Sequence, residues 1–544
     1  MPVEMTEFLL RSSTLDGFCA ELCEEVVGTR GAQSILEELE RLNVFIVALD
    51  DERKWYRYHR LFAELLQHRL HLTCTSGDVA TLHVRAGRWL EAALETEAAI
   101  GHYLAAKDYG EVFRLVEEQH QRILTSGGLG VLLAWMSQVP EEVIAAEPMA
   151  ATLTGVFYAF AGHGEEAERW FSAAEAQLDL YQNEEVPRKT SKMRGIVAAV
   201  RAFLADMAGR TARVVEMAEL ADALLPANEA MTRSLVPYTL SRAYRLQGDL
   251  DRADHYVEQH IGYSRAADNI WILSGAIHEK VLICRLRGRL AESERVLDEF
   301  EDLARHVTSV GPLAKSIAAR ADLLAERGNL EGAAATADDA VSAVMRWGLP
   351  SDVCFCLQTR VRVFMCRGEL SAAAEDLSRV GEIVGAARVY ASILPRHETQ
   401  SVRLMLARDD IEQAVAWLDR YRYPDTGNII DRESVDITRA RVMLAAGRIS
   451  EAQQLLEQLA SGAESGARFG RLIEVLVLQA VAAIEPASDA PLRKALEIGE
   501  PEGYRTVFIA EGEQLARRIR SMLNQPKTLP RRLVDYASHL VDER

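Results

Sequence analysis

The feature that most constrains this chain is a short phrase that returns six times at nearly fixed spacing. The phrase is glycine (once aspartate), a polar residue, Leu or Ile, two mostly polar or small residues, and then Ala or Ser. Its copies begin at Gly248, Gly288, Gly328, Gly368, Asp409 and Gly447, at intervals of 40, 40, 40, 41 and 38 residues. Weaker copies begin at Gly162 and Gly209. A period of roughly 40 residues is typical of solenoids built from stacked helical hairpins.

Each phrase predicts the turn between the two helices of a hairpin. Glycine adopts the left-handed conformation at a helix end without steric cost, and the small residue lets the second helix approach the first closely. An arginine directly before the turn is expected to compensate the negative end of the first helix; these are Arg287, Arg327, Arg367 and Arg408. One hairpin alone leaves its apolar face exposed, so neighbours must stack. We therefore predict an all-α fold, a TPR-like right-handed superhelix of about eight or nine hairpins.

Composition agrees with this fold and disfavours several classes of function. Hydrophobic residues make up 49% of the 544 residues and aromatic residues only 7%, as in stacked helices. The net charge of −19 argues against direct binding of nucleic acid. Seven cysteines, without a signal peptide, predict reduced thiols in the cytoplasm, and the longest uncharged stretches are too short for a membrane span.

Motifs of catalysis are missing from the sequence. No Gly-Lys dipeptide occurs, so there is no phosphate-binding P-loop. The pairs His278-Glu279 and His397-Glu398 lack the second histidine of a zinc protease, because Leu282 and Ser401 occupy its position. We therefore expect no enzymatic activity, no metal and no bound cofactor.

The first residues follow a different pattern from the repeats. The expected order is helix, helix, β-hairpin, helix, with these bounds: Asp16–Val27, Gly31–Leu42, Val44–Leu49 paired with Trp55–Tyr58, and a last helix beginning at His59. This order is typical of a small winged-helix unit.

Several segments, in this order, resemble one family of regulators. They are Phe8–Asp16, Leu49–Asp51, Trp55–Phe62, His83–Tyr103, Leu133–Pro140 and Glu500–Phe508. With them the chain resembles the MalT-like family, the ATP-dependent transcriptional regulators of LuxR type. The resemblance implies a P-loop ATPase before the winged-helix unit, and a helical connector, a repeat superhelix and a DNA-binding helix-turn-helix after it.

We divide the chain accordingly into a winged-helix unit (1–72), a connector (73–147), a TPR-like superhelix (148–460) and a divergent terminal repeat with C-terminal helices (461–544). Because the P-loop and the helix-turn-helix are both missing from this sequence, we expect it to be the sensing and coupling part of such a regulator.

The resemblance also suggests a role for His59. In related signalling ATPases a histidine of the winged-helix unit approaches the β-phosphate of bound ADP, and His59 is the matching position. It could contact a nucleotide only on an ATPase of another chain. The alternative is that His59 caps a helix while Trp55, Tyr56, Tyr58 and Phe62 form the small core.

Ligand contacts are expected on the concave face of the superhelix, which the first helix of each hairpin lines. Exposed aromatic and arginine side chains there are candidate anchors; they are Tyr238, Arg242, Trp271, His278, Trp347, Phe355 and Arg403. The alternative is that these side chains belong to the core between repeats.

We predict a non-enzymatic signal-sensing and protein-interaction module that binds a small-molecule inducer or a protein partner in the superhelical groove. An ATPase or DNA-binding subunit encoded separately is a further candidate partner. Two alternatives stay open. In the first, the chain is a free-standing adaptor that binds a partner's peptide or helix. In the second, it is the truncated remnant of a regulator gene.

Overall fold

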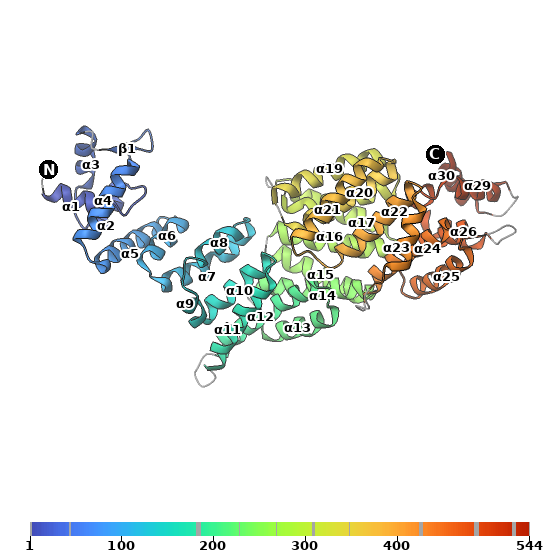
Figure 1. The fold of residues 1–544 in the computed structure, drawn as a ribbon, viewed down its shortest axis with the longest axis horizontal. Helices are drawn as coiled ribbons and strands as arrows, with labels where there is room; N and C mark the ends of the chain where they lie inside the picture. Colours follow the sequence, from blue (N-terminus) through green and yellow to red (C-terminus); the bar gives the residue numbers. More distant parts are fainter. Residues whose placement is uncertain are drawn as a thin grey trace. The chain divides into compact units, whose positions relative to one another are not determined.

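The chain divides into two compact, mainly helical units (Figure 1). The computed structural model describes residues 3–42, 45–180, 187–227, 229–267, 269–306, 311–347, 349–423, 428–483, 489–524 and 529–542. Unit 1 comprises residues 1–161 and 165–184, and unit 2 comprises residues 162–164 and 185–544. The described residues form 30 α-helices and one two-stranded sheet, which confirms the predicted helical class.

Unit 1 begins with the expected order of helices and strands, preceded by one additional helix. The elements are α1 (Val3–Ser12), α2 (Ala20–Val27), α3 (Ala32–Arg41), β1 (Ile46–Ala48), β2 (Tyr56–Tyr58) and α4 (Arg60–Thr73). The strands are antiparallel, with Ile46 opposite Tyr58. Helix α2 starts later than predicted because Phe18 exchanges two backbone hydrogen bonds of 2.8 Å with Tyr56. Val44, predicted in the first strand, lies outside the described residues.

The small core of this region is aromatic. The rings of Phe18 and Tyr58 lie 4.7 Å apart, and the hydroxyls of Tyr58 and Ser12 share a hydrogen bond of 2.7 Å. Tyr56 is also buried, whereas Trp55 is half-buried and packs against Trp89 of the next helix pair.

The rest of unit 1 is a run of helices joined by short turns. They are α5 (Ser76–Ala92), α6 (Thr96–Ala106), α7 (Tyr109–Thr125), α8 (Leu129–Met136), α9 (Glu141–Ala146), α10 (Pro148–Phe160) and α11 (Gly164–Leu180). The pair α10–α11, which we had placed at the start of the superhelix, groups with unit 1 almost entirely.

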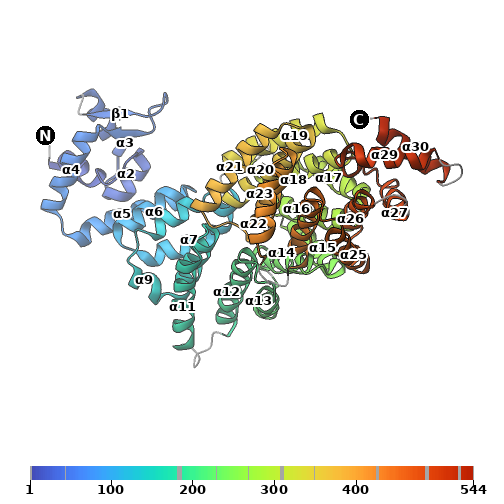
Figure 2. The same cartoon turned by 45° about the vertical axis from the view of Figure 1, so that its right-hand side comes forward.

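Unit 2 contains eight consecutive helical hairpins among its described residues (Figure 2). The hairpins are α12–α13 (Pro187–Met207, Thr211–Leu224), α14–α15 (Ala230–Leu246, Leu250–Ala266), α16–α17 (Ile270–Leu286, Leu290–Ala304), α18–α19 (Ala314–Glu326, Leu330–Trp347), α20–α21 (Pro350–Arg367, Leu370–Ala386), α22–α23 (Ile393–Ala407, Ile411–Arg420), α24–α25 (Ile429–Ala445, Ile449–Ser465) and α26–α27 (Phe469–Ala482, Ala490–Gly499). Helices α28 (Thr506–Ile509), α29 (Gly512–Leu523) and α30 (Arg531–Asp542) follow.

The six turns of the repeated phrase share one geometry. The first residue of each is left-handed, with φ between 60° at Asp409 and 83° at Gly328. The next residue donates its backbone N–H to the carbonyl five residues earlier, as Asp249 does to Tyr244 over 2.9 Å, and this satisfies the helix end. The small residue that closes the phrase is fully buried in every copy: Ala253, Ser293, Ala333, Ala373, Ala414 and Ala452.

The arginines before the turns do more than compensate a helix end. The guanidinium of Arg287 donates to the carbonyl of Leu250 over 3.1 Å and pairs with Asp254 at 2.9 Å. That of Arg408 donates to the carbonyl of Leu370 over 3.0 Å. Both side chains therefore tie one hairpin to the second helix of the preceding one.

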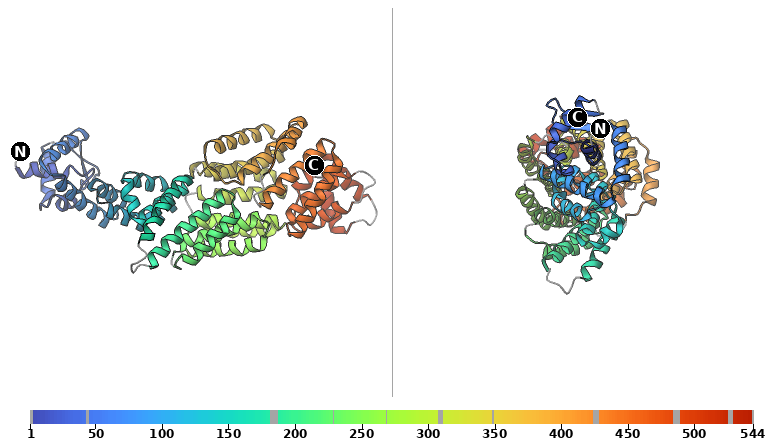
Figure 3. Two further views of the ribbon diagram at one scale, coloured as in Figure 1. Left: turned by 60° about the horizontal axis from the view of Figure 1, so that its bottom comes forward. Right: turned by 90° about the vertical axis from the view of Figure 1, so that its left-hand side faces the viewer.

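The superhelix of unit 2 returns onto itself. Helix α14 contacts α24, α16 contacts α26 and α18 contacts α28, and in Figure 3 the orange and red helices lie beside the green ones. At the crossing of α16 and α26, a Cβ at Gly470 would overlap the carbonyl oxygen of Arg285. The backbone N–H of Arg505 donates to the carbonyl of Glu326 over 2.9 Å. The C-terminal helices are thus part of one core with α15–α18.

Because of this return, substitution of two turn glycines that share one conformation should destabilise the protein by different amounts. Gly288→Ala and Gly368→Ala should each cost about 1–2 kcal/mol, because both residues have positive φ. A Cβ at Gly288 would also lie 3.0 Å from Cβ of Phe469 and 3.1 Å from the backbone nitrogen of Gly470, whereas one at Gly368 would meet nothing. Gly288→Ala should therefore cost about 1–3 kcal/mol more. Urea unfolding followed by circular dichroism measures both, and equal losses would contradict the observed packing.

Candidate functional site: the polar interior of the superhelix

A ladder of ion pairs joins the first helices of successive hairpins. Arg242 on α14 pairs with Asp206 on α12 at 2.7 Å, and Arg245 pairs with Glu279 on α16. These side chains are nearly inaccessible to solvent, with 1% of Glu279 exposed. A buried charge is tolerated only where a partner compensates it, so the register of the hairpins and this ladder depend on each other.

The ladder continues through a carboxylate that three arginines share. Asp322 on α18 lies 2.9 Å from Arg285, 2.8 Å from Arg362 and 3.9 Å from Arg396. Glu326, one turn along, pairs with Arg285 and Arg362 as well. Burial by itself raises the pKa of Asp322, but the three guanidinium groups outweigh it and hold that pKa well below its usual range.

A second cluster lies near the C-terminal end of the ladder. Arg441 on α24 pairs with Glu474 at 3.1 Å and with Glu511, and Arg471 lies 3.5 Å from Glu474. Burial opposes ionisation of Glu474, but Arg441, Arg471 and Arg403 lower its pKa to about 2. Glu474 is therefore ionised at neutral pH.

Aromatic side chains surround the N-terminal end of the ladder. The guanidinium of Arg242 lies 4.4 Å from the ring centre of Tyr390 and 5.5 Å from that of Tyr238, and the two hydroxyls are 3.4 Å apart. Tyr390 belongs to the connection between α21 and α22, which also donates a backbone hydrogen bond from Ala391 to Met207 over 2.8 Å. This connection thus joins α12 and α14 to the sixth hairpin.

The expectation of an open groove with exposed anchors is wrong for the central candidates. Arg242 and His278 are only 8% and 6% exposed. His278 packs edge-on against Phe355 at 4.3 Å, and Arg396 stacks on Phe355 at 5.1 Å. The reason is that these first helices meet α12, α16, α20 and the connection between α21 and α22 where we expected solvent.

The remaining predicted groove residues differ in position. Tyr238, Trp271, Phe355 and Arg403 are half-buried on the first helices α14, α16, α20 and α22. Trp347 ends α19, a second helix, and so departs from the expected face; its side chain lies outside the described residues.

His59 precedes α4 and is exposed to solvent. It occupies the N-cap position of α4, as the alternative interpretation expects, although its side chain makes no capping hydrogen bond. Its backbone N–H donates to the carbonyl of Phe45 over 2.7 Å. Phe45, Val47 and Leu49 are more than a third exposed, which leaves this side of the hairpin apolar and uncovered. The nucleotide contact proposed for His59 stays a prediction.

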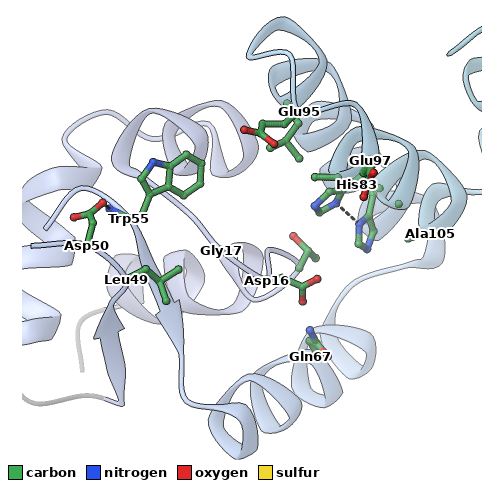
Figure 4. Close-up of a pocket in the computed structure, with 15 residues that line it drawn as sticks. Asp16, Gly17, Leu49, Asp50, Trp55, Gln67, His83, Glu95, Glu97 and Ala105 are labelled. Atoms are coloured by element: carbon green, nitrogen blue, oxygen red, sulfur yellow. Dashed lines mark hydrogen bonds between the residues drawn. The ribbon is translucent and has the colours of Figure 1, made fainter. Parts of the chain in front are cut away.

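Unit 1 contains a cavity of about 850 Å³ that sequence reasoning missed (Figure 4). Its lining includes Asp16, Trp55, Glu95 and Glu97, together with His83 and His102. The two histidines face each other with 2.9 Å between their Nδ1 atoms, so one ring donates and the other accepts. Burial, followed by the neighbouring His83, lowers the pKa of His102 to about 4, and the pKa of His83 is lowered as well, mainly by burial.

The ion-pair ladder did have a signal in the sequence. Six residues before the first residue of each turn stand Arg242, Leu282, Asp322, Arg362, Arg403 and Arg441. Five of these six positions are charged although each belongs to a helix packed between neighbours. Charged residues at an otherwise buried repeat position indicate a polar interior, and this pattern was available before the structure.

The described residues offer neither a metal-binding cluster nor a membrane-spanning helix. No group of three or more His, Cys, Asp or Glu side chains in this part of the chain could hold a metal ion. Among the same residues, no helix combines the length and apolar character that crossing a membrane requires.

Comparison with known proteins identifies the family. The model of the MalT-like TPR region matches residues 195–525, and that of the MalT winged helix domain matches residues 1–77. The chain belongs to the MalT-like family. It is 24% identical over 534 residues to the HTH-type transcriptional regulator MalT of Cronobacter sakazakii, and 24% identical over 537 residues to that of Serratia proteamaculans. These alignments cover 96% and 97% of this chain but only 58% of each relative.

Solved structures show distant similarity to this MalT-like chain. A STAND protein with a tetratricopeptide repeat sensor from Pyrococcus horikoshii is 11% identical, with a TM-score of 0.33 over 92% of this chain and 63% of its own. The apo form of the quorum sensor NprR from B. thuringiensis is 15% identical, with a TM-score of 0.39 over 68% of this chain and 98% of its own.

The lowered pKa of Glu474 predicts that the free energy of unfolding of unit 2 falls at acid pH. A carboxyl with a folded pKa of about 2, below its ordinary 4.5, contributes stability that is fully present above pH 4.5 and is lost as the pH falls through 2. Glu474→Gln should therefore cost about 3–5 kcal/mol at pH 7, because it removes one of the two carboxylates that compensate Arg441 and the one that Arg471 contacts. The difference between the variant and the wild type in the free energy of unfolding should shrink between pH 4.5 and pH 2.

Chemical denaturation at several pH values measures this difference. The matched control is Glu457→Gln on α25, an exposed carboxyl for which we expect no change. A Glu474→Gln penalty that stays constant down to pH 2 would show that its charge does not stabilise unit 2.

Proposed function

We propose that unit 2 is the signal-sensing element of a MalT-like regulator and that it binds a small-molecule inducer or a protein partner inside the superhelix. The family membership supports a sensor region of a transcriptional regulator. The proposed site is the interior lined by the ion-pair ladder of the first helices, rather than an open concave groove. An ATPase or DNA-binding subunit is the proposed recipient of the signal.

The observation that carries this proposal is that the interior holds polar groups without partners. Nδ1 of His278 and Oε1 of Gln400 are buried, and no hydrogen-bond partner reaches them among the described residues. Oε2 of Glu279 is buried without a hydrogen bond as well, and its contact with Arg242 is a long ion pair of 3.8 Å. A buried polar group without a partner is costly, so a ligand that satisfies it gains free energy on binding. Unpartnered groups among the ion pairs of this interior therefore support a ligand-binding interior.

The same interior offers a route from binding to conformational change. Buried ion pairs add little net stability, because desolvation offsets most of their attraction. Asp322 is shared by Arg285 and Arg362. A ligand that replaces one of these ion pairs therefore shifts the spacing between hairpins at a small cost in free energy. Each hairpin contacts mainly its neighbours, so such a shift propagates along the array.

The test is a ligand screen followed by hydrogen exchange on the full chain. Oligosaccharides, nucleotides, amino acids and phosphorylated metabolites are screened by thermal shift, and each hit is then followed by exchange with mass spectrometry. We expect a hit to protect α14, α16, α18 and α22, with no change in the N-terminal elements α1–α4. Protection confined to unit 1, or to the second helices, would contradict an interior site.

A further inference from the structure

Helix α22 presents three polar side chains along one face. Arg396, Gln400 and Arg403 are spaced by four and three residues, which places them on the same side of an α-helix. The two arginine positions are ~10 Å apart along the helix axis. The helix lies between the first helices α20 and α24, which carry Arg362 and Arg441.

The arginines of α22 are less well compensated than those of its neighbours. Arg362 pairs with Asp322 at 2.8 Å and with Glu326 at 2.7 Å, and Arg441 pairs with Glu474 and Glu511. Arg396 reaches only Asp322, at 3.9 Å, and donates a 3.3 Å hydrogen bond to Thr359. For Arg403 no carboxylate of the described residues lies within ion-pair distance.

The carboxylate nearest to Arg396 is already occupied. Asp322 compensates Arg285 and Arg362 at 2.9 and 2.8 Å, so its charge is shared among three guanidinium groups. Burial, followed by neighbouring arginines, lowers the pKa of Arg396 to about 10 although Asp322 opposes the shift. Burial and then Arg441 also lower the pKa of Arg403, although Glu474 and Glu511 oppose the shift from beyond ion-pair distance.

Gln400 adds an acceptor without a donor between these two cations. Its side-chain amide donates to the carbonyl of Gln358 over 2.7 Å, while its Oε1 is buried and unpartnered. The residue is 7% exposed. The arginines on either side keep some contact with solvent, and 29% of the Arg396 side chain is accessible.

We propose that Arg396, Gln400 and Arg403 form a binding site for a small anionic molecule that carries a phosphate or carboxylate group and a hydroxyl or amide donor. The anion supplies negative charge beside Arg396 and Arg403, and the donor satisfies Oε1 of Gln400. Guanidinium groups bind both kinds of oxyanion through paired hydrogen bonds. This site rests on the proposed sensing function and names the chemistry of its ligand.

The experiment measures anion binding by the full chain. Inorganic phosphate and citrate are titrated by calorimetry at constant ionic strength, with chloride as the balancing anion, and thermal midpoints are recorded in parallel. We expect at least one of the two probes to raise the thermal midpoint above the midpoint measured in chloride. The ratio of their affinities distinguishes a phosphate ligand from a carboxylate ligand.

Two variants and one control assign the binding to α22. Arg403→Gln should bind the better probe at least tenfold more weakly, and Arg403→Lys should lie between it and the wild type because it keeps the charge but loses the planar fork. The control Arg432→Gln on α24, whose side chain is 63% exposed, should bind like the wild type. Without a probe, Arg403→Gln should unfold cooperatively with a midpoint near that of the wild type, because Arg403 makes no direct ion pair with the described residues and Glu474 keeps its contacts with Arg441 and Arg471.

Two outcomes would overturn the site. One is a wild type that phosphate and citrate stabilise no more than chloride, and the other is an Arg403→Gln variant that binds them as the wild type does. Either result leaves the sensing function standing if an uncharged compound protects the first helices in hydrogen exchange. If no compound protects them but Arg403-dependent anion binding is present, the site stands and only the breadth of the screen is at fault.

Discussion

The architecture of unit 2 depends on the close approach of α16 and α26 where the superhelix returns onto itself. Gly470 touches the carbonyl of Arg285, and a side chain at this position would force the two helices apart. At the next hairpin, the backbone N–H of Arg505 donates a hydrogen bond of 2.9 Å to the carbonyl of Glu326, at the end of α18. These contacts place the C-terminal helices against α16 and α18, so the array is a closed body and not an extended ribbon.

Closure explains the chemistry of the interior. A first helix that would face solvent in an open solenoid is here surrounded by other helices, and most of its charged residues have partners inside. Arg242, Arg285, Arg362 and Arg441 do so through carboxylates on neighbouring first helices. Because each carboxylate serves more than one arginine in the middle of the array, a change at one hairpin alters the compensation of the next. The interior can therefore respond to a ligand while the apolar layer between the helices of each hairpin stays intact.

Much of the hairpin architecture could be predicted from the sequence, because the turn has local causes. Glycine at a left-handed position and a small residue five positions later are both visible in a single copy of the phrase, as at Gly328 and Ala333. The same turn at Leu94, Lys107 and Ala467 has no such signature, since these residues adopt positive φ of 65°, 58° and 51° without being glycine. Their conformation follows from the helices on either side, and local sequence does not record it.

The site was harder to predict for a related reason. The periodicity identified the inward-facing helices, so Arg242, His278, Phe355 and Arg403 were named, but it did not reveal what packs across from them. That depends on contacts between residues more than 100 positions apart, such as Tyr238 with Tyr390. The cavity of unit 1 was missed because His83 and His102 come from different helices, and neither has a distinctive sequence context.

The most direct test of the closed superhelix is hydrogen exchange of the segment that contains Arg505, whose N–H crosses to Glu326. In the wild type the peptide 503–509 should exchange slowly, and Gly470→Ala should make it exchange rapidly while α20 and α21 keep their protection. A helical glycine with open space around it, Gly275, provides the control, because Gly275→Ala should leave the peptide protected. Rapid exchange of peptide 503–509 in the wild type would show that the C-terminal helices do not close the superhelix, and it would contradict the account.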